Sequence, residues 1–480
     1  MLGGAPGDHR QVRDSSVKAS GEDWVVDVTR YPVAACLAVA AILLFLIPGM
    51  ARAQETEVPP PAALGSEDAM GSPTSGAAST RRDTASDAVD DAIREIKTKE
   101  GGRVDVLGRR RDAVQAWRAC IDRRYGLSFG INYTVLYQRA SRGRGPLDAA
   151  VGDLDLFARW RAFGKDDFDA GTLYAYTEWR HRLGTDIAPF NLSKSLGTLH
   201  ETTTGFTEQP FAVTQFYWEQ DWGRGRWTAQ LGKIDPALSF FGNRINNVNA
   251  YFVGFPFSDS PAVFFPGAAL GANLTYRFSD SWDLKVGVQD ANGEKLGDAF
   301  ETIQEGELWW SGQLRHTRCI RGLGMGNYRA GRWYTEPRSE PERPDGGGFV
   351  VSLDQELGRP GAVGFVRYEW QSDPLESARQ GVGAPRQGLV PSRQALRVGA
   401  VLDGLIPSRA WRDDVFGLGA SLSEPYDDRL RDEYLLEAFW RFQLAPDVQL
   451  TPSYQLFIDP ANNRAASTIS VFSIRFRLLL

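Results

Sequence analysis

The chain has 480 residues, a formal net charge of −6 and 24% charged residues, so no basic surplus indicates a nucleic-acid partner. Aromatic residues make up 11%, with 14 Trp, and Gly is abundant at 50 residues, a mixture that favours strands, tight turns and interfacial aromatic rings. A mean hydropathy of −0.32 excludes a helical transporter.

An apolar run at residues 33–48 predicts export. Arg30 precedes it, residues 51–53 offer small residues for cleavage, and the run is too short to span a membrane comfortably. We therefore expect residues 1–53 to be a signal peptide, with a membrane anchor as the alternative. The leader before the run carries five acidic residues, so we expect the true translation start to lie downstream of Met1.

The chain has three cysteines, Cys36, Cys120 and Cys319, and cleavage would remove the first. In an oxidising compartment Cys120 and Cys319 can form a disulfide, but two exported thiols are equally compatible with two unpaired cysteines. Cys36 is not expected to carry a lipid, because a lipoprotein cysteine ends an apolar run and here the run follows it.

Residues 54–82 consist largely of Pro, Ala, Ser, Gly and Thr, which cannot bury enough apolar surface to offset the entropy of ordering. We expect a disordered linker there. Residues 83–124 have apolar positions at roughly helical spacing, interrupted by Gly101-Gly102, and predict a periplasmic helical segment. A plain helix pair and an element that faces another protein or peptidoglycan are both compatible with this pattern.

From residue 125 to the end, the apolar residues repeat with period two, which predicts strands. The alternation is clear at residues 153–161, 282–289, 436–444 and 472–480. A soluble sandwich would also alternate. Here the polar faces hold many arginines and acids, and the apolar faces end in Trp, Tyr or Phe, which is typical of a barrel in an outer membrane.

The links between strands alternate in length. Strand candidates start near residues 126, 153, 171, 211, 227, 269, 282, 307, 326, 349, 362, 395, 414, 433, 448 and 468. Tight links follow even-numbered strands, at 223–226, 279–281, 358–361 and 445–447, and long links follow odd-numbered strands, at 182–209, 234–268, 290–306, 335–347 and 372–393. With both chain ends in the periplasm, the short turns lie there and the long loops lie outside.

We therefore predict an all-β membrane barrel over residues 125–480, built from about 16 antiparallel strands. The barrel is expected to close, because lipid offers no hydrogen-bonding partner to the edge of a sheet. Barrels of this size keep an aqueous lumen, so the fold predicts a channel.

Several motifs follow one another in a set order from Tyr125 to Leu480. They are Trp218-Glu-Gln-Asp-Trp222, Leu231-Gly-Lys-Ile-Asp235, Pro266-Gly267, Gly271-Ala-Asn-Leu274, Val286-Gly-Val-Gln-Asp-Ala291, residues 326–333, residues 404–409 ahead of Asp413-Asp414 and Gly417, and residues 450–455 leading into 459–463. Their order resembles the carbohydrate-selective porins of Gram-negative outer membranes, the OprB family. The resemblance implies a sixteen-stranded barrel with an N-terminal periplasmic helical segment, and diffusion of mono- or small oligosaccharides into the periplasm through a lumen narrowed by loops.

The partners expected from this resemblance are outer-membrane lipid, carbohydrate solutes and the barrel-assembly machinery, which would bind the C-terminal strand. The chain departs from the usual pattern at Leu480, where such barrels end in an aromatic residue, so we expect weaker recognition by that machinery. No nucleic acid, metal or cofactor is expected, and both a monomer and a trimer are compatible with the sequence.

A sugar pathway needs hydrogen-bond donors and acceptors beside aromatic rings. Strand parity and the link at 234–268 supply the candidates Tyr176, Glu178, Arg180, Tyr217, Glu219, Lys233, Asp235, Asn243, Arg244, Asn246, Asn247, Asn249 and Arg277. Because the link is rich in Phe, we expect it to fold into the barrel as the constriction, with Arg244 and the Asn side chains binding hydroxyls. The alternative packs its Phe residues against the rim or a neighbouring subunit.

Lys233 breaks the strand parity with Leu231, which predicts a bulge or the strand end at that point. A pair between Lys233 and Asp235 or Glu219 would serve structure alone.

Glycoside hydrolysis is the rival function, because it needs two positioned acids such as Glu178 and Glu219. Acids are abundant in any porin lumen, however. The four His have no metal-ligand spacing, and no Gly-x-Ser-x-Gly elbow or phosphate loop occurs at a strand–helix junction. We therefore predict a channel and not an enzyme, with a general small-solute porin and an envelope-tethering barrel as the alternatives.

Overall fold

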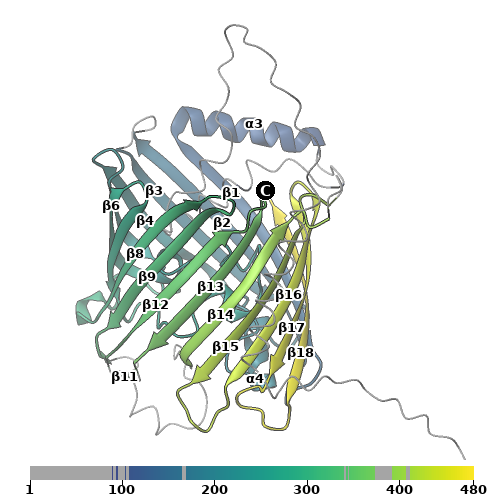
Figure 1. Ribbon diagram of the computed structural model, residues 1–480. Coiled ribbons are helices and arrows are strands. Elements are labelled where there is room, and N and C mark those ends of the chain that lie inside the picture. The colour runs from purple at the N-terminus through teal and green to yellow at the C-terminus, as the bar shows by residue number, and fades with distance from the viewer. Residues whose placement is uncertain are drawn as a thin grey trace, which may run out of the picture.

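A barrel of antiparallel strands forms the body of the protein in the computed structural model (Figure 1). The structure describes Val89, Ile93, Glu95, Arg103 and residues 108–164, 169–339, 342–343, 345–372, 392–406 and 411–480. The expected signal peptide and linker, residues 1–82, lie outside the described residues.

The barrel contains sixteen strands, as predicted. They are β1 (Leu127–Ala140), β2 (Asp148–Phe163), β3 (Gly171–Arg182), β4 (Gln209–Trp222), β5 (Trp227–Ile234), β6 (Ala269–Ser279), β7 (Trp282–Asp290), β8 (Leu308–Ile320), β9 (Gly324–Thr335), β12 (Gly346–Glu356), β13 (Ala362–Gln371), β14 (Ser392–Asp403), β15 (Val415–Pro425), β16 (Glu433–Ala445), β17 (Val448–Ile458) and β18 (Thr468–Leu479). The largest difference from the predicted starts is at β2, expected at 153 and beginning at Asp148.

One long helix precedes the barrel, and short elements occupy several of the links. In chain order, they are α3 (Gly108–Tyr125) before β1, η4 (Pro189–Asn191) and α4 (Leu192–Leu196) between β3 and β4, α5 (Pro236–Ser239) and α6 (Phe255–Ser258) between β5 and β6, η5 (Ile303–Glu305) between β7 and β8, and the hairpin β10 (Arg338–Ser339) and β11 (Glu342–Arg343) between β9 and β12. No helix among the described residues combines the length and the apolar character that a bilayer crossing requires.

The first and last strands close the barrel. β1 pairs with β2 on one side and with β18 on the other, so that Asn132 lies opposite Asp155 and opposite Leu479. Each consecutive pair of barrel strands is antiparallel, and the sheet has no open edge. The predicted closure is confirmed.

Side chains alternate between a polar interior and an apolar exterior. In β18, Phe472 and Ile474 are exposed on the outside, whereas Ser473, Arg475 and Arg477 are buried on the inside. A strand that turns successive side chains to opposite faces gives this pattern directly. The distribution is the reverse of a soluble sandwich, in which the centre is dry and apolar, and it confirms the prediction of a membrane barrel.

Aromatic side chains form a girdle near each end of the exterior. At one end it includes the exposed side chains Trp160, Phe163, Trp222, Phe278 and Trp282, and at the other Trp179, Phe211, Trp310, Tyr334 and Phe349. Trp and Tyr favour the level of the lipid headgroups, because one end of the ring is apolar and the other is polar. The strands between the girdles therefore correspond to the hydrocarbon region.

The links confirm the predicted alternation. The end of the barrel that carries α3 and the C-terminus has the short turns at 223–226, 280–281 and 446–447, and we call it the turn end (Figure 1). The opposite end, the loop end, carries the long links 183–208, 235–268 and 291–307.

The link between β14 and β15, residues 404–414, is an exception, because it lies at the turn end and is not a tight turn. It serves as a docking point for the chain that precedes α3. The Arg103 guanidinium pairs with Asp414 at 2.8 Å and lies over the Trp411 ring, 4.0 Å from its centroid.

Cys120 lies on α3 and Cys319 lies in β8, and both thiols are free and exposed. The disulfide that the sequence allowed is therefore not formed. Of the two alternatives, the structure has the unpaired cysteines.

A charged substitution on the exterior should destabilise the barrel. Leu231 lies in the middle of β5 with 61% of its surface exposed, so Leu231→Arg would place a cation in hydrocarbon. We expect a loss of about 2–4 kcal/mol in the free energy of unfolding, because lipid cannot solvate the charge. The measurement is denaturant unfolding of the barrel reconstituted in lipid.

Leu296→Arg is the matched control, because Leu296 is exposed in the loop-end link 291–307 and its replacement stays in water. Equal losses for the two variants would contradict the assignment of the β5 exterior to the hydrocarbon region.

Candidate functional site

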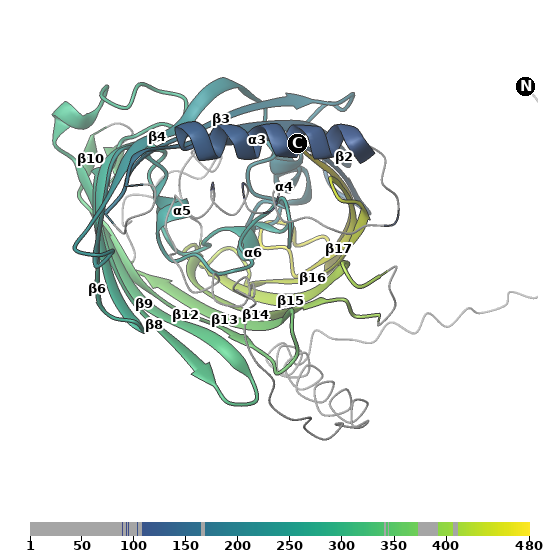
Figure 2. The same ribbon diagram turned by 90° about the horizontal axis from the view of Figure 1, so that it is seen from above.

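The link at 235–268 lies inside the barrel and narrows it. Figure 2 shows α5 and α6, which belong to this link, within the ring of strands. β5 ends at Ile234, and the Asp235 side chain accepts a hydrogen bond from the Ala237 N–H at 2.9 Å, which caps α5 and turns the chain inward. We call residues 235–268 the inner loop.

Carboxylates of the barrel wall bind backbone N–H groups of the inner loop. Glu437 on β16 accepts from Val253 N at 2.6 Å and from Gly254 N at 2.8 Å. Glu369 on β13 accepts from Ala262 N at 2.9 Å. A Cβ at Gly254 would lie 2.6 Å from the Glu437 Oε2, so a larger residue there would push this carboxylate away from its N–H partners.

Cations of the wall bind backbone carbonyls of the same loop. Arg367 on β13 donates to the Phe241 carbonyl, Arg397 on β14 donates to the carbonyls of Pro256 and Asp259, and Arg475 on β18 donates to that of Val248. Lys285 on β7 donates to the Ser239 carbonyl at 2.6 Å. The wall thus supplies hydrogen bonds that an irregular backbone inside a barrel cannot make with itself.

The Phe residues of the inner loop pack against the interior of the wall. Phe252 lies against Phe439 of β16, with ring centroids 4.9 Å apart, in a cluster that also holds Phe257 and Phe365. A second cluster combines Phe240, Phe241 and Val263 of the loop with Trp309, Trp333 and Val350 of β8, β9 and β12. The loop therefore folds into the barrel, and its Phe residues are not at the rim.

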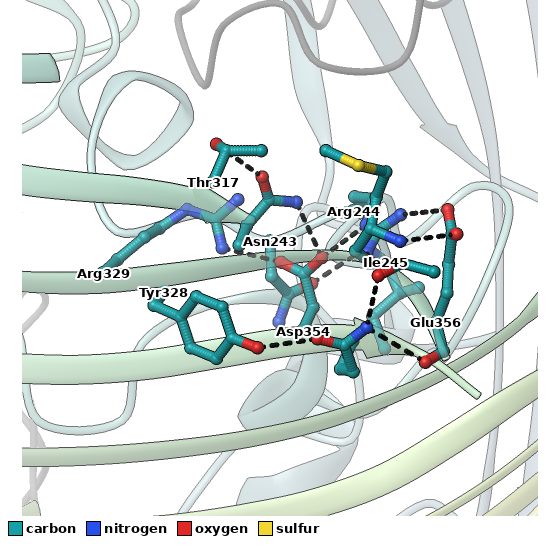
Figure 3. Close-up of polar contacts among 12 residues, drawn as sticks. Asn243, Arg244, Ile245, Thr317, Tyr328, Arg329, Asp354 and Glu356 are labelled. Atoms are coloured by element: carbon teal, nitrogen blue, oxygen red, sulfur yellow. Dashed lines mark hydrogen bonds and ion pairs between the residues drawn. The ribbon is translucent and has the colours of Figure 1, made fainter. Parts of the chain in front are cut away.

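Arg244 clamps the inner loop to the wall formed by β9 and β12 (Figure 3). Its guanidinium pairs with Asp354, with Glu356 at 3.1 Å and with the Met325 carbonyl at 2.9 Å. Asp354 also accepts from Arg329 at 2.6 Å. Each of the three guanidinium nitrogens donates to the protein, so Arg244 holds the loop, and its binding of hydroxyls stays a prediction.

The asparagines of the inner loop have different roles. The side chains of Asn243 and Asn247 accept from the N–H two residues on, at 2.9 Å each, which are turns that shape the loop. The Asn249 amide donates to Asp155 on β2 at 3.4 Å. The Asn246 Oδ1 is buried and makes no hydrogen bond within the described residues. Asn249 is therefore the point where the loop reaches the opposite wall.

That opposite wall carries a cluster of acids with two cations. Arg180 on β3 pairs with Asp153 at 3.1 Å and with Glu178 at 2.5 Å, and Lys295 from the link 291–307 pairs with Glu178 at 2.5 Å. Asp155 accepts from Asn132 at 2.9 Å. We call Asp153, Asp155, Glu178, Arg180 and Lys295 the acidic wall.

Aromatic rings continue this wall towards the turn end. Tyr174 and Tyr217 stack with ring centroids 5.1 Å apart, and Phe157 stacks on Tyr176 at 6.5 Å. Strand pairing brings them together, because Tyr174 on β3 lies opposite Tyr217 on β4.

The N-terminal chain also enters the barrel. Val89 and Ile93 pack with Phe157, Tyr174 and Tyr217 in one buried cluster. Glu95 pairs with Arg477 of β18 at 2.9 Å and accepts from Gln449 of β17 at 3.3 Å. These residues cover the stacked tyrosines and occupy part of the lumen.

Three further predicted residues are not members of the acidic wall, and one of them, Lys233, contacts it through Lys295. Lys233 is next to last in β5, which confirms the predicted strand end, and its ammonium donates to the carbonyls of Lys295 and Gly297 at 3.0 and 2.8 Å. Glu219 accepts from Gln230 at 2.9 Å. Arg277 lies opposite Asp283 beside the short turn at 280–281, and so at the turn end. Arg277 therefore lies away from the constriction, whereas the place of Lys233 in the pathway stays a prediction.

Asp235 is half-buried and lies close enough to the acidic wall for Lys295 and Glu178 to act on its charge. Burial raises the pKa of its carboxyl above the ordinary value, and Lys295 opposes that effect. Burial likewise raises the pKa of Asp259, farther along the inner loop, to about 6.

The sequence reasoning missed most wall residues that hold the inner loop. They are Lys285, Asp354, Glu356, Arg367, Glu369, Arg397, Glu437 and Arg475. Strand parity placed Arg475 among the inward-facing polar residues, and the same parity pairs Arg367 with Glu369. The pattern gives the face of each residue, but it does not give the loop atom that the residue binds.

Comparison with known proteins was made by family and by structure. Residues 169–478 match the model of the carbohydrate-selective porin, OprB family. The high-pH structure of Pseudomonas putida OprB is similar at 14% identity and a TM-score of 0.59, over 76% of this chain and 96% of that one. A mutant Rh. blastica porin is similar at 13% identity and a TM-score of 0.45, over 74% and 100%. No curated protein matches the chain.

Removing the Arg244 clamp should loosen the constriction. Arg244→Ala leaves Asp354 and Glu356 without this partner, at a cost of about 1.5–3 kcal/mol for hydrogen bonds to charged groups, and frees the loop from β9 and β12. We expect higher and noisier single-channel currents in planar bilayers, with an intermediate effect for Arg244→Lys.

Arg429→Ala is the control, because Arg429 pairs with Asp427 in an exposed link at the loop end. Currents that stay unchanged in the Arg244 variants would remove the inner loop from the constriction.

Breaking the pair between Glu95 and Arg477 should widen the lumen. Glu95→Gln removes the charge that holds the N-terminal chain on β18, so we expect a larger conductance than in the parent protein. The exchanged pair Glu95→Arg with Arg477→Glu should restore the parent value. A conductance that does not respond to either change would show that the N-terminal chain does not limit the current.

Proposed function

The chain belongs to the carbohydrate-selective porin, OprB family, and from this premise we propose which part of its lumen the sugars follow. It is an outer-membrane channel through which carbohydrates diffuse passively. We propose that they pass between the acidic wall and the inner loop, past Asn249 and the half-buried Tyr176.

One observation carries this proposal. The interior of the barrel has two unlike walls, because Arg367, Arg397 and Glu437 are engaged with the backbone of the inner loop, whereas Asp153, Asp155, Glu178 and Arg180 form a cluster that the inner loop contacts at Asn249. Carboxylates, a guanidinium and an amide can exchange hydrogen bonds with sugar hydroxyls, and the half-buried ring of Tyr176 can stack on the apolar face of a pyranose.

We also propose the orientation and processing of the chain. The turn end faces the periplasm, in line with the lengths of the links and with the place of α3 and the C-terminus. Residues 1–53 are removed as a signal peptide, residues 54–82 form a linker, and the assembly machinery recognises β18 despite its final Leu480. The protein inserts as a monomer or a trimer.

We propose that the protein catalyses no reaction. Glu178 is paired with Arg180 and Lys295, and Glu219 accepts from Gln230, so neither acid of the rival glycosidase is placed with its partner across an open site. Release of products from oligosaccharides that disappears in Glu178→Gln and Glu219→Gln would overturn this proposal.

The selectivity can be tested by swelling of proteoliposomes. We expect neutral mono- and small oligosaccharides to enter faster than amino acids and anions of similar size. Equal rates of entry for all classes of solute would contradict the sugar preference and would indicate a general small-solute porin.

The acidic wall can be tested by the same swelling assay together with electrical recordings in planar bilayers. Glu178→Gln removes one anion beside Arg180 and Lys295 and leaves the shape intact, so we expect slower sugar entry and a reversal potential that shifts towards anions. Glu208→Gln is the matched control, because Glu208 pairs with Arg182 in the exposed part of the loop end. Identical behaviour of both variants would move the pathway away from the acidic wall.

A further inference from the structure

Helix α3 presents its apolar side away from the protein. Val114 and Trp117, one turn apart, are 45% and 56% exposed, and Ala113 and Cys120 share that exposure. The side that meets the barrel is polar instead, with Arg111, Gln115, Arg118 and Asp122, which recur at the same helical spacing and are half-buried or buried. A helix of a water-soluble protein would instead turn its apolar side to the protein and its polar side to water.

The exposed apolar side continues the membrane surface of the barrel. The Trp117 ring meets the ring of Phe129 edge-on, with centroids 5.5 Å apart, and Phe129 lies on β1 in the outward parity of the exposed Ile131. The Trp160 indole, in the turn-end girdle, donates to the Tyr125 carbonyl at the end of α3 at 3.2 Å. Trp117 and Tyr125 therefore extend the girdle beyond the strands, and Figures 1 and 2 show α3 lying across this rim.

Cations flank the apolar side. Arg110 and Arg124 are exposed at the two ends of the helix and lie on the same side as Trp117 by helical spacing, and Arg123 and Tyr125 are exposed beside Arg124. Arginine next to Trp and Tyr suits a headgroup layer, where phosphates accept hydrogen bonds and the rings reach the acyl boundary.

We infer that α3 lies in the headgroup region of the turn-end leaflet and binds its anionic phospholipids through Arg110, Val114, Trp117 and Arg124. Arg118 fixes the rotation of the helix, because it lies over the Phe129 ring at 5.4 Å and is attracted to Asp447 of the β16–β17 turn. The apolar side is thus turned to lipid while the polar side stays on the barrel.

The single thiol of α3 permits a direct test. In a background with Cys36→Ser and Cys319→Ser, Cys120 is labelled with a fluorophore in the full chain reconstituted in nanodiscs that contain phosphatidylglycerol and brominated lipid. We expect at least a twofold stronger quenching at Cys120 than at a label on Asp112→Cys, made in a background that also carries Cys120→Ser. Asp112 is exposed on the remaining side of α3, which faces neither the barrel nor the proposed lipid.

The charge dependence gives a second measurement. Arg110→Gln with Arg124→Gln should abolish the difference in Cys120 quenching between discs with and without phosphatidylglycerol. Equal quenching of the two labels, or none at Cys120, would overturn the inference. The inference would also be overturned if the Cys120 label were exposed to water in pure lipid and shielded from water only in native outer membrane. That result would place a protein on this face.

Single-channel conductance of the same labelled variants, measured in planar bilayers, shows that the barrel inserts and conducts. A failure of the quenching test with an intact channel would therefore refute the lipid contact and leave the proposed sugar pathway untouched.

Discussion

Backbone polar groups that water cannot reach must find hydrogen-bond partners inside the protein, and this constraint organises both the wall and the interior of the barrel. An unsatisfied amide in hydrocarbon costs several kcal/mol, which is why β1 pairs with β18 and the sheet has no edge. The inner loop meets the same constraint without regular structure. Its amides bind Glu369 and Glu437, and its carbonyls bind Arg367 and other cations of the wall.

The same constraint separates the charges that hold the inner loop from those that can contact a passing solute. A charge that binds the loop backbone is desolvated and fixed, so it stabilises the constriction more than it solvates a passing molecule. Most of these charges lie on β13, β14, β16 and β18, and Lys285 adds one from β7. The acidic wall on β2 and β3 is balanced instead by the Arg180 and Lys295 side chains, and in the pathway that we propose sugar hydroxyls exchange with these ion pairs.

The fold was predictable from sequence because its rule is local. Every strand must alternate between lipid and lumen, so period two and the parity of the links were sufficient to predict sixteen strands, with an error of a few residues at β2. The site was less predictable because its contacts are not local. Arg244 was recognised as important, but its partner Asp354 is 110 residues away along the chain, and strand parity cannot specify such a pair. The prediction for Arg277 has a related limit. Parity gives the face of the strand on which Arg277 lies, but it does not give the depth of Arg277 along the barrel.

The path of the N-terminal chain connects the lumen to the membrane surface. Glu95 lies inside the barrel on β18, Arg103 lies on the 404–414 link, and Trp117 contacts Phe129 on the outer face of β1. The chain therefore leaves the lumen over the turn-end rim before it enters β1. An anchor on the outside of the barrel restricts how far the residues inside can move, because the two are joined by one short stretch of chain. The contact of α3 with Phe129 and the packing of Val89 and Ile93 on Tyr174 and Tyr217 therefore belong to one N-terminal segment, which joins the outer face of the barrel to its interior.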